Sequence, residues 1–431
     1  MPVEVAINWA KDRAGSAFEK HAVLVKNSGA LAIASVGAAF LGFIFWWLAA
    51  RSFPPEVIGK ASAFISLMAF IGLIGDGGLG TLLVGEIIRW PGRKHNLISA
   101  AVLVSLSLSL LAGAIGLTAT ELVSNLKLYW IDNLLLLIGC GLTGLSIAVD
   151  AAFVGMLQST YRMLRQFSFS VFKLILIPVA ALLFSDVTAL LSVWVVALVI
   201  SLSLAELSLR YSGRSLIHRP DFKLLWTLKR KSVDYYMLDL GNIAPGTIMP
   251  YLVAVLLSPA SNAAFTMIWM VVSVALVIPG SMATVLFPAI RSEPHQYRDK
   301  MLLSLVASLL YATTCSGFIF LYSKEILTIF NPAYAVIGDE HLRLLGVGMF
   351  GAVIKFHVCT AARLTNCMRP AAFWFCIAGL FELACVITGS WAAALEGLVI
   401  GWATAMMVEG AAMLLLVNPC GNRHALADMP H

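Results

Sequence analysis

Residues 167–207 read FSFSVFKLILIPVAALLFSDVTALLSVWVVALVISLSLAEL. This stretch holds two long apolar runs, and only Ser185 and Asp186 separate them. A run of about 20 apolar residues is long enough to cross the hydrocarbon core of a bilayer as an α-helix. The stretch therefore predicts two membrane-spanning helices joined by a tight turn.

Similar runs recur along the whole chain. Hydrophobic residues make up 60% of the 431 residues and charged residues only 12%, whereas about a quarter of the residues of a soluble domain are charged. We predict an all-α polytopic membrane protein with twelve spans. They cover 29–50, 61–83, 97–119, 133–155, 167–184, 187–207, 235–257, 263–287, 301–322, 341–361, 371–389 and 395–417.

The positive charges lie on one side of these spans. Of the 29 lysines and arginines, 22 lie in the N-terminal segment, the C-terminal segment and every second gap, and only five lie on the other side, four of them in gaps and Arg343 at the outer end of the span 341–361. The remaining two, Lys173 and Lys355, fall inside spans. Because loops rich in Lys and Arg stay in the cytoplasm, we predict a multi-pass protein of the cell (inner or plasma) membrane with both termini cytoplasmic. The net charge of +6 then reflects topology and not nucleic-acid binding.

The longest and most basic gap divides the chain into two halves of six spans. The predicted parts are a cytoplasmic arm (1–28), an N-lobe (29–207), a basic linker (208–234), a C-lobe (235–417) and a cytoplasmic tail (418–431). Within the linker, DFKLLWTLKRK (221–231) predicts an amphipathic helix with Leu224, Leu225 and Leu228 toward the membrane.

The two halves also resemble each other. A shift of about 204 residues brings Pro55 onto Pro259 and Gly75 onto Pro279, so a proline turn is followed in each half by a span with a weakened helix. Six spans per copy is an even number, which predicts a parallel repeat about an axis along the membrane normal. Two such bundles suit a transporter that binds substrate between them and alternates access by rocking.

Asp76 is the first polar group inside a span. It lies in GLIGDGGLG (72–80), where Gly75–Gly80 matches G-x-G-x-x-G by letter. A dinucleotide site needs that motif between a strand and a helix, so here we interpret the glycines as weakening the helix or admitting another backbone. Asp76 is then a candidate cavity carboxylate that binds a proton or cation; the alternative is a helix-end carboxylate near the outer surface.

Cations inside the membrane suggest an anionic substrate. Lys173 and Lys355 lie deep in their spans, and Lys355 shares a helix face with Arg363, eight residues on. Such cations suit phosphate or pyrophosphate; the alternative is an ion pair with a carboxylate that fastens the halves. His357 titrates near neutral pH in the unperturbed state, and a hydrogen-bonded helix contact is its other possible role.

Further carboxylates lie within the spans. Asp239 precedes Pro245 and Pro250, which should break that helix and free backbone groups that need polar company. Glu382 and Glu409 are mid-span, where a packing role and a proton site are both open. Two others, Asp150 and Glu206, lie near cytoplasmic ends, so we expect them to be solvated.

The sequence contains no G-x-x-x-x-G-K-[ST] loop, so the chain by itself is not expected to drive transport with ATP. No serine, cysteine or metal centre is evident either. We therefore expect neither an enzyme nor a cofactor, apart from a coupling H⁺ or Na⁺.

Three stretches resemble a known family. They are GFIFWWLAARSFPPEVIGKASAFISLMAFIGLIGDGGLGTLLV (42–84), VDAAFVGMLQSTYRMLRQFSFSVFKLILIP (149–178) and IKFHVCTAARLTN (354–366). They resemble Wzx-type oligosaccharide flippases of the multidrug/oligosaccharidyl-lipid/polysaccharide (MOP) superfamily. The resemblance implies a MATE-like fold of two six-helix lobes around a central cavity. It also implies export of an undecaprenyl-diphosphate-linked oligosaccharide for surface polysaccharide synthesis.

The same resemblance implies roles for individual residues. Lys173, Lys355 and Arg363 become expected substrate contacts, and Asp76 an expected coupling residue. Membrane lipid is an expected partner, and polysaccharide-assembly proteins are possible ones.

Two other functions compete with this interpretation. A MATE-like antiporter would exchange a cationic drug or metabolite for H⁺ or Na⁺, but intramembrane lysines disfavour a cationic substrate. A membrane glycosyltransferase or polymerase would need a large outer loop with catalytic residues, and the outer gaps here are short.

Overall fold

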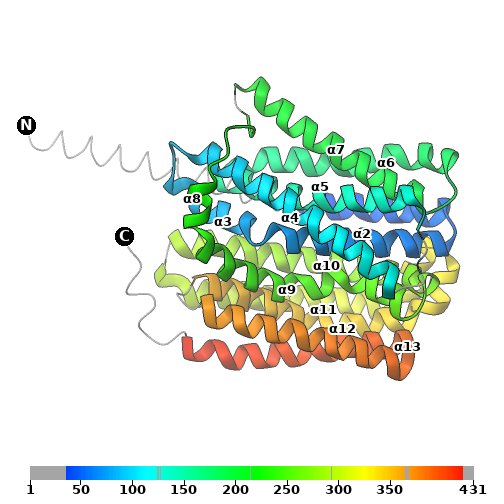
Figure 1. Cartoon of the computed structure of the whole chain (residues 1–431). Helices are drawn as coiled ribbons and strands as arrows, with labels where there is room; N and C mark the ends of the chain where they lie inside the picture. The colour runs from blue at the N-terminus through cyan, green and yellow to red at the C-terminus, as the bar shows by residue number, and fades with distance from the viewer. Residues whose placement is uncertain are drawn as a thin grey trace, which may run out of the picture.

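The computed structural model describes residues 35–123, 126, 128–213, 215–292, 294–364 and 368–420. These residues form long helices with no strand among them (Figure 1). The α-helices are α1 (Ser35–Ser52), α2 (Pro55–Asp76), α3 (Leu79–Glu86), α4 (Lys94–Val123), α5 (Trp130–Gly155), α6 (Ser159–Leu183), α7 (Val187–Tyr211), α8 (Phe222–Thr227), α9 (Lys229–Leu256), α10 (Pro259–Ser292), α11 (Tyr297–Phe330), α12 (Pro332–Leu364) and α13 (Met368–Cys420).

The described helices account for the twelve predicted crossings. Ten of them are long and apolar enough to span a membrane. One of the ten, α13, bends at Ala393 and Ala394 and so supplies two crossings. The twelfth is α9, whose 28 residues exceed the length that a bilayer requires. The predicted tight turn is confirmed: α6 ends at Leu183, and Asp186 caps α7 by accepting a hydrogen bond from Thr188 N at 3.2 Å.

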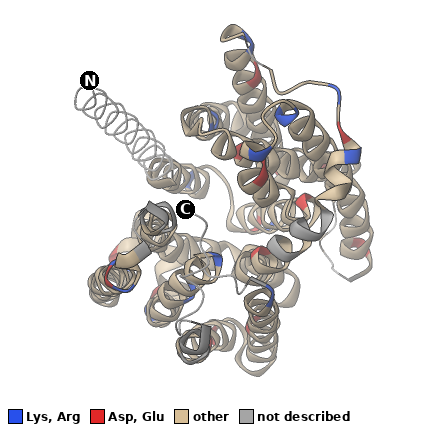
Figure 2. Ribbon diagram, turned by 90° about the vertical axis from the view of Figure 1, so that its left-hand side faces the viewer, with Lys and Arg blue, Asp and Glu red and all other residues tan. Residues whose placement is uncertain are grey.

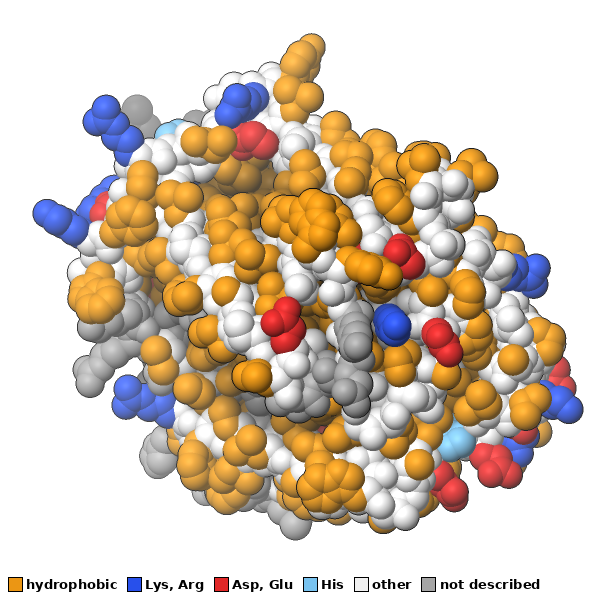
Figure 3. Space-filling view, turned by 45° about the vertical axis from the view of Figure 1, so that its right-hand side comes forward, with side chains coloured by type: hydrophobic (Ala, Val, Ile, Leu, Met, Phe, Trp, Pro, Cys, Tyr) orange, Lys and Arg blue, Asp and Glu red, His pale blue; other side chains and the backbone are white. Residues whose placement is uncertain are grey.

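The helices form two bundles, as the sequence predicts. Helices α1–α7 form the N-lobe and α9–α13 the C-lobe, and Figure 2 shows the helices end-on in two groups. Helix α2 lies at the boundary, because it contacts α4, α5 and α7 of its own lobe and α9 and α10 of the other. Hydrophobic side chains dominate the surface seen in Figure 3, as expected of helices that face lipid.

The predicted repeat has a direct structural expression. Helices α2 and α10 begin at Pro55 and Pro259, and they pack against each other near these ends. The hydroxyls of Ser62 and Thr266 hydrogen-bond at 2.8 Å, and these residues are 204 apart in sequence. Equivalent residues of two copies can touch only close to the axis that relates the copies, so the pseudo-two-fold axis passes between α2 and α10.

The two ends of the bundle differ in how the lobes meet. We call the end that holds the Asp186 turn and the starts of α2 and α10 the turn end, and the end that holds α8 the linker end. At the turn end, Trp47 Nε1 of α1 donates to the Ile329 carbonyl at 3.0 Å. A Cβ added at Gly59 would lie 1.7 Å from the Pro259 carbonyl oxygen, so the two backbones are in close contact. The lobes are therefore tightly closed at the turn end.

The linker helix differs from the prediction. Helix α8 has only six residues, and α9 starts directly after Leu228. Leu224, Leu225 and Leu228 do not face the membrane; they are buried in a cluster with residues of α3 and α4 in the N-lobe. The exposed apolar side chains of α8 are instead Phe222 and Trp226.

Two further expectations need correction or lie outside the structure. Helix α9 continues through Pro245 and Pro250 and is not broken by them. The predicted arm (1–28) lies outside the described residues, and so does most of the predicted tail, because the description ends at Cys420.

Candidate functional site

Asp76 lies at a break between two helices near the linker end. Helix α2 ends at Asp76, and Gly77 and Gly78 follow with φ of 57° and 74° before α3 begins at Leu79. Positive φ is strained for residues with a Cβ, so the glycines produce the break. Both carboxylate oxygens of Asp76 accept from the Gly80 N–H, at 3.0 and 3.2 Å. Asp76 is thus a buried helix-end carboxylate. It lies near the end of the bundle that the predicted topology places in the cytoplasm, and not near the outer surface.

A polar contact joins the lobes close to this break. Thr81 of α3 donates to Asp239 Oδ2 of α9 at 2.6 Å, and Arg363 of α12 donates to Asp239 Oδ1 at 2.7 Å. The structure therefore brings together Asp239 and Arg363, which were predicted separately. Thr81 connects this pair to the N-lobe. This contact lies at the linker end, where α3 and α12 end and α9 begins.

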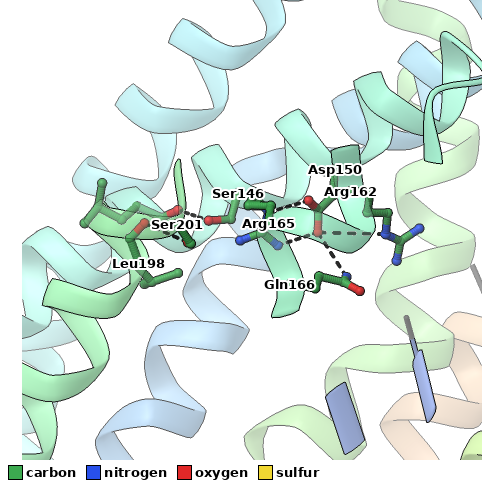
Figure 4. Close-up of polar contacts among 8 residues, drawn as sticks. Ser146, Asp150, Arg162, Arg165, Gln166, Leu198 and Ser201 are labelled. Atoms are coloured by element: carbon green, nitrogen blue, oxygen red, sulfur yellow. Dashed lines mark hydrogen bonds and ion pairs between the residues drawn. The ribbon is translucent and has the colours of Figure 1, made fainter. Parts of the chain in front are cut away.

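A second set of charges lies on α6 of the N-lobe. Arg165 holds Asp150 of α5 with two hydrogen bonds of 2.5 Å, from Nε and Nη2 (Figure 4). Arg162 lies 3.9 Å from the same carboxylate, and Gln166 donates to it at 3.2 Å. One carboxylate therefore faces two arginines.

The expectation that Asp150 and Glu206 are simply solvated is wrong. The Asp150 side chain is only 13% exposed, because it belongs to this ion-pair cluster. Glu206 accepts hydrogen bonds from Arg210, Ser215 and the Leu216 N–H, so it attaches the start of the linker to α7.

Lys173 lies further along α6, on the same helix face as Arg162, eleven residues earlier. It is 5% exposed, and its ammonium lies over the rings of Phe45 (4.9 Å), Phe169 (4.2 Å) and Trp194 (4.1 Å). No carboxylate pairs with it among the described residues. Aromatic faces attract a cation but supply no negative charge to balance it.

Phe45 connects Lys173 to the boundary between the lobes. It lies on α1, and α1 contacts the C-lobe through the ring pair Phe43–Phe330, with centroids 4.8 Å apart. Helix α1 therefore separates the Lys173 ammonium from the C-lobe.

Lys355 lies in a buried cluster of the C-lobe. Its ammonium is 3.1 Å from Glu382 Oε2 and 2.7 Å from Glu409 Oε2, and Trp402 Nε1 donates to Glu382 Oε1 at 3.0 Å. Two predicted carboxylates thus converge on one predicted cation. This geometry favours the ion-pair alternative for Lys355 over direct substrate contact, although the pair lies within one lobe and does not fasten the two halves.

His357 has both ring nitrogens engaged. Nε2 lies 3.0 Å from Ser304 Oγ of α11, and Nδ1 lies 2.9 Å from the Val353 carbonyl oxygen. This arrangement matches the helix-contact alternative.

Some important partners were not predicted. Thr81 and Trp402 are ordinary residues in a sequence of this composition, and only the fold brings them to Asp239 and Glu382. The 204-residue shift makes Ser62 and Thr266 equivalent positions of the repeat. Their contact could not be predicted, because the sequence does not show where the axis between the two copies passes.

The chain matches the model of the family described as "Polysaccharide biosynthesis protein" over residues 24–292, which is more than half of its length. The chain belongs to this family. No curated protein matches the sequence significantly.

The fold is that of solved MOP-superfamily transporters. The family member is similar to an inward-facing multidrug resistance MATE transporter, with a TM-score of 0.70 at 15% identity over 90% of this chain and 96% of that one. It is also similar to a MOP-superfamily transporter from Pyrococcus furiosus, with a TM-score of 0.68 at 15% identity over 91% and 95% of the chains. An outward-facing MATE transporter gives 0.64 at 14% identity over 93% and 96%. This member of the polysaccharide biosynthesis protein family thus has the fold of MOP-superfamily transporters.

Proposed function

We propose that this transporter flips a polyprenyl-diphosphate-linked oligosaccharide from the inner to the outer leaflet by alternating access. The observation that carries the proposal is the cationic face of α6. Asp150 faces two arginines, and Lys173 has no carboxylate partner among the described residues. A charge inside the membrane costs about 2.5–3.5 kcal/mol on insertion scales, so an excess of positive charge needs a reason. An anionic cargo supplies one, and a cationic drug does not.

A published contrast within the superfamily supports this direction. The similar Pyrococcus furiosus transporter is described as having a binding pocket of reversed polarity that suggests a different function. The charges on α6 suggest a comparable departure from cationic drug export here.

Lys173 becomes accessible in this proposal when α1 moves. Phe45 of α1 covers the ammonium, and α1 also contacts the C-lobe through Phe43 and Trp47. Separation of the lobes would pull α1 away from α6. The ammonium would then face the space between the lobes and could bind a diphosphate oxygen.

Arg363 is the second proposed anion contact. Its side chain is 36% exposed and donates to Asp239 at 2.7 Å. A guanidinium binds phosphate oxygens in a two-pronged geometry, so a diphosphate would compete with Asp239. Its binding would weaken the Thr81–Asp239 contact between the lobes and so couple cargo binding to opening of the linker end.

The direction of transport follows from the charge distribution. The basic loops favour a cytoplasmic linker end, and in that orientation the tightly closed turn end would face outward. The sugar and diphosphate would enter from the cytoplasm, while the polyprenyl tail stays in the bilayer. With no nucleotide-binding loop in the sequence, energy would come from an H⁺ or Na⁺ gradient, and Asp76, beside Asp239 at the lobe boundary, is a candidate coupling residue.

A reconstituted flipping assay tests the proposal. The purified protein is placed in liposomes with a fluorescent polyprenyl-diphosphate oligosaccharide, an ion gradient is imposed, and quenching by a membrane-impermeant reagent is followed. We expect gradient-dependent quenching with the wild type and its loss in Arg363→Gln, while Lys324→Gln, at an exposed lysine, is unaffected. Gradient-driven movement of a cationic dye without flipping of the glycan lipid would instead identify a drug antiporter.

A further inference from the structure

The buried cluster of the C-lobe has an uneven charge count. The Lys355 ammonium lies within 3.1 Å of a carboxylate oxygen of Glu382 and of Glu409, and each of the three side chains is at most 4% exposed. One ammonium and two carboxylates leave a net charge of −1 if all three are ionised. Because an uncompensated charge inside the bilayer is costly, the cluster needs one more positive charge.

Hydrogen bonding distinguishes the two carboxylates. Both oxygens of Glu382 accept, one from Trp402 Nε1 and one from Lys355. Glu409 meets Lys355 through an ion pair at Oε2, and neither of its buried oxygens has a hydrogen-bond partner in the described part of the chain. The ion pair at Oε2 leaves Oε1 as the oxygen with no contact to a cation among the described residues. A buried carboxylate oxygen with no donor is unfavourable. Glu409 Oε1 is therefore the atom where the missing positive charge belongs.

The geometry selects a proton over a metal ion. The Lys355 ammonium already occupies the space between the carboxylates, at 2.7 and 3.1 Å from them. A hard metal cation needs several oxygen ligands at once. Among the described residues of this cluster only the two oxygens of Glu409 lack a hydrogen bond, and one of them, Oε2, already faces the ammonium. A proton needs only one atom, Oε1.

We propose that Glu409 is an exchangeable proton site, held in place by Lys355 and Glu382 and coupled to movement of the C-lobe helices. The role of this site in coupling rests on the proposed function, because the site would bind the coupling ion of that transport. Proton binding makes the cluster neutral, and proton release leaves it with a charge of −1. No bond other than the carboxyl O–H forms or breaks.

The helices around the cluster are packed closely enough to transmit a change of charge at Glu409. A Cβ at Gly351 of α12 would lie 2.0 Å from the Met406 carbonyl oxygen of α13, so these backbones touch without intervening side chains. Trp402 connects Glu382 to α10: its indole N–H donates to Glu382, and its ring makes an edge-on contact with Trp269 of α10, with centroids 5.0 Å apart. A change of charge at Glu409 would therefore act on α10, the helix that meets α2 at the pseudo-two-fold axis.

Other ionisable groups near the cluster do not supply the missing charge. Cys359 of α12 interacts electrostatically with Lys355, and Cys385 of α13 with Glu409. Both are neutral or negative in any protonation state. Asp239 of α9 and Arg363 of α12, which also interact electrostatically with Cys359, are paired with each other, and His357 faces Ser304 of α11.

Infrared difference spectroscopy of the purified protein tests the site without any transport. We expect the wild type to show the carbonyl-stretch band of a buried carboxylic acid at neutral pH, lost on deprotonation at higher pH. Glu409→Gln should remove this band, whereas Glu396→Gln, at an exposed position of the same helix, should leave it. The Asp76→Asn variant measures how much of the band intensity comes from the Asp76 carboxyl group.

Two more variants separate a proton site from a merely structural cluster. Lys355→Met leaves two carboxylates without a cation, so the acid band should grow. Glu409→Gln imitates the protonated state and should keep the wild-type Tm, whereas Glu382→Gln leaves Trp402 or Lys355 without an acceptor and should lower it. A band that is absent in wild type, or that keeps its full strength in Glu409→Gln, would overturn the assignment.

Transport then distinguishes the two proposals. If the proton site is real and the function correct, Glu409→Gln liposomes flip the glycan lipid at a rate that no longer responds to a pH gradient. Loss of the infrared band in Glu409→Gln with no flipping by wild type would retain the site and reject the cargo. Flipping by wild type with no such band would retain the cargo and reject the site.

Discussion

At the scale of single residues, the decisive question for each intramembrane charge is whether it has a partner. Asp239 has one arginine partner, so its charge is locally balanced, whereas Asp150 faces two arginines. In the described part of the chain, Lys173 contacts three aromatic rings and no carboxylate. Lys355 has two carboxylates and is over-compensated. These four environments look alike in the sequence, where each is an isolated charge in an apolar run.

Lys173 gives a test in which function and stability diverge. A cation–π contact is worth about 0.5–2 kcal/mol, while a buried unpaired charge costs about 2.5–3.5 kcal/mol. We therefore expect Lys173→Met to keep or raise the Tm, because an apolar side chain of similar length fills the ring cage. Loss of a charge-assisted contact of about 1.5–3 kcal/mol should slow flipping about ten- to a hundredfold. Thermal unfolding in detergent and the liposome assay measure the two effects.

The control for this test is Lys324→Met, at an exposed lysine of α11, which should change neither quantity. A marked fall in Tm for Lys173→Met would mean that the lysine is a structural clamp between α1, α6 and α7. Flipping at the wild-type rate would remove it from cargo recognition.

At the scale of elements, the structure shows how the linker is attached to one lobe. Leucines of α8 enter a cluster of the N-lobe, and Asp221 caps α8 by accepting from the Leu224 N–H at 3.0 Å. Arg93, just before α4, pairs with the same carboxylate, and the Asp221 N–H donates to the Asn96 carbonyl. Because α9 follows immediately after Leu228, the boundary between the two lobes lies at the α8–α9 junction.

Asp221 makes this attachment testable and gives it a defined pH dependence. The Leu224 N–H, followed by the Arg93 guanidinium, holds the pKa of the Asp221 carboxyl below its ordinary value. A lowered folded-state pKa means that the stabilisation is complete above the unfolded value of about 3.9 and is lost as the pH falls through the folded value. We expect linker docking to be constant from about pH 5 to neutrality and to weaken only in stronger acid.

Hydrogen exchange of residues 215–228 measures this docking. Asp221→Asn should accelerate exchange there at neutral pH, because it removes the charge that Arg93 pairs with and weakens the helix cap. Asp299→Asn, at an exposed carboxylate of α11, should not affect it. Unchanged exchange in Asp221→Asn would show that the leucine cluster alone holds the linker.

At the scale of the whole molecule, closure at the turn end is concentrated near the pseudo-two-fold axis. Ser62 and Thr266 meet there, and Asn262 donates to the Gly59 carbonyl at 2.7 Å and to Ser62 Oγ at 2.9 Å. Away from the axis, Trp47 adds its contact with Ile329. Rocking that opens the outer side must break this set of contacts.

A reversible cross-link tests that motion. In a cysteine-free background, Ser62→Cys with Thr266→Cys should form a disulfide, because the native hydroxyls are 2.8 Å apart. Oxidation should abolish flipping and reduction should restore it, while Ser62→Cys alone should respond to neither treatment. Flipping at full rate by the oxidised double variant would show that this end stays closed during transport.

Much of the architecture follows from the sequence itself. Apolar run lengths determine the twelve crossings, because a helix needs about 20 such residues to span a bilayer whatever surrounds it. The 204-residue shift predicts two similar lobes, and the glycines after Asp76 predict a helix break. These features are local or periodic, so they can be recognised without knowing which helices are neighbours.

What only the tertiary structure decided is the pairing of the charges. A helix rotated by 100° turns a side chain to a different neighbour, and hydropathy does not specify that rotation. Contacts between distant segments therefore join Lys355 to Glu382 and Glu409, join Thr81 to Asp239, and surround Lys173 with rings. The same reason explains the error at α8, whose leucines are apolar enough for lipid but are buried against α3 and α4 once the N-lobe has assembled.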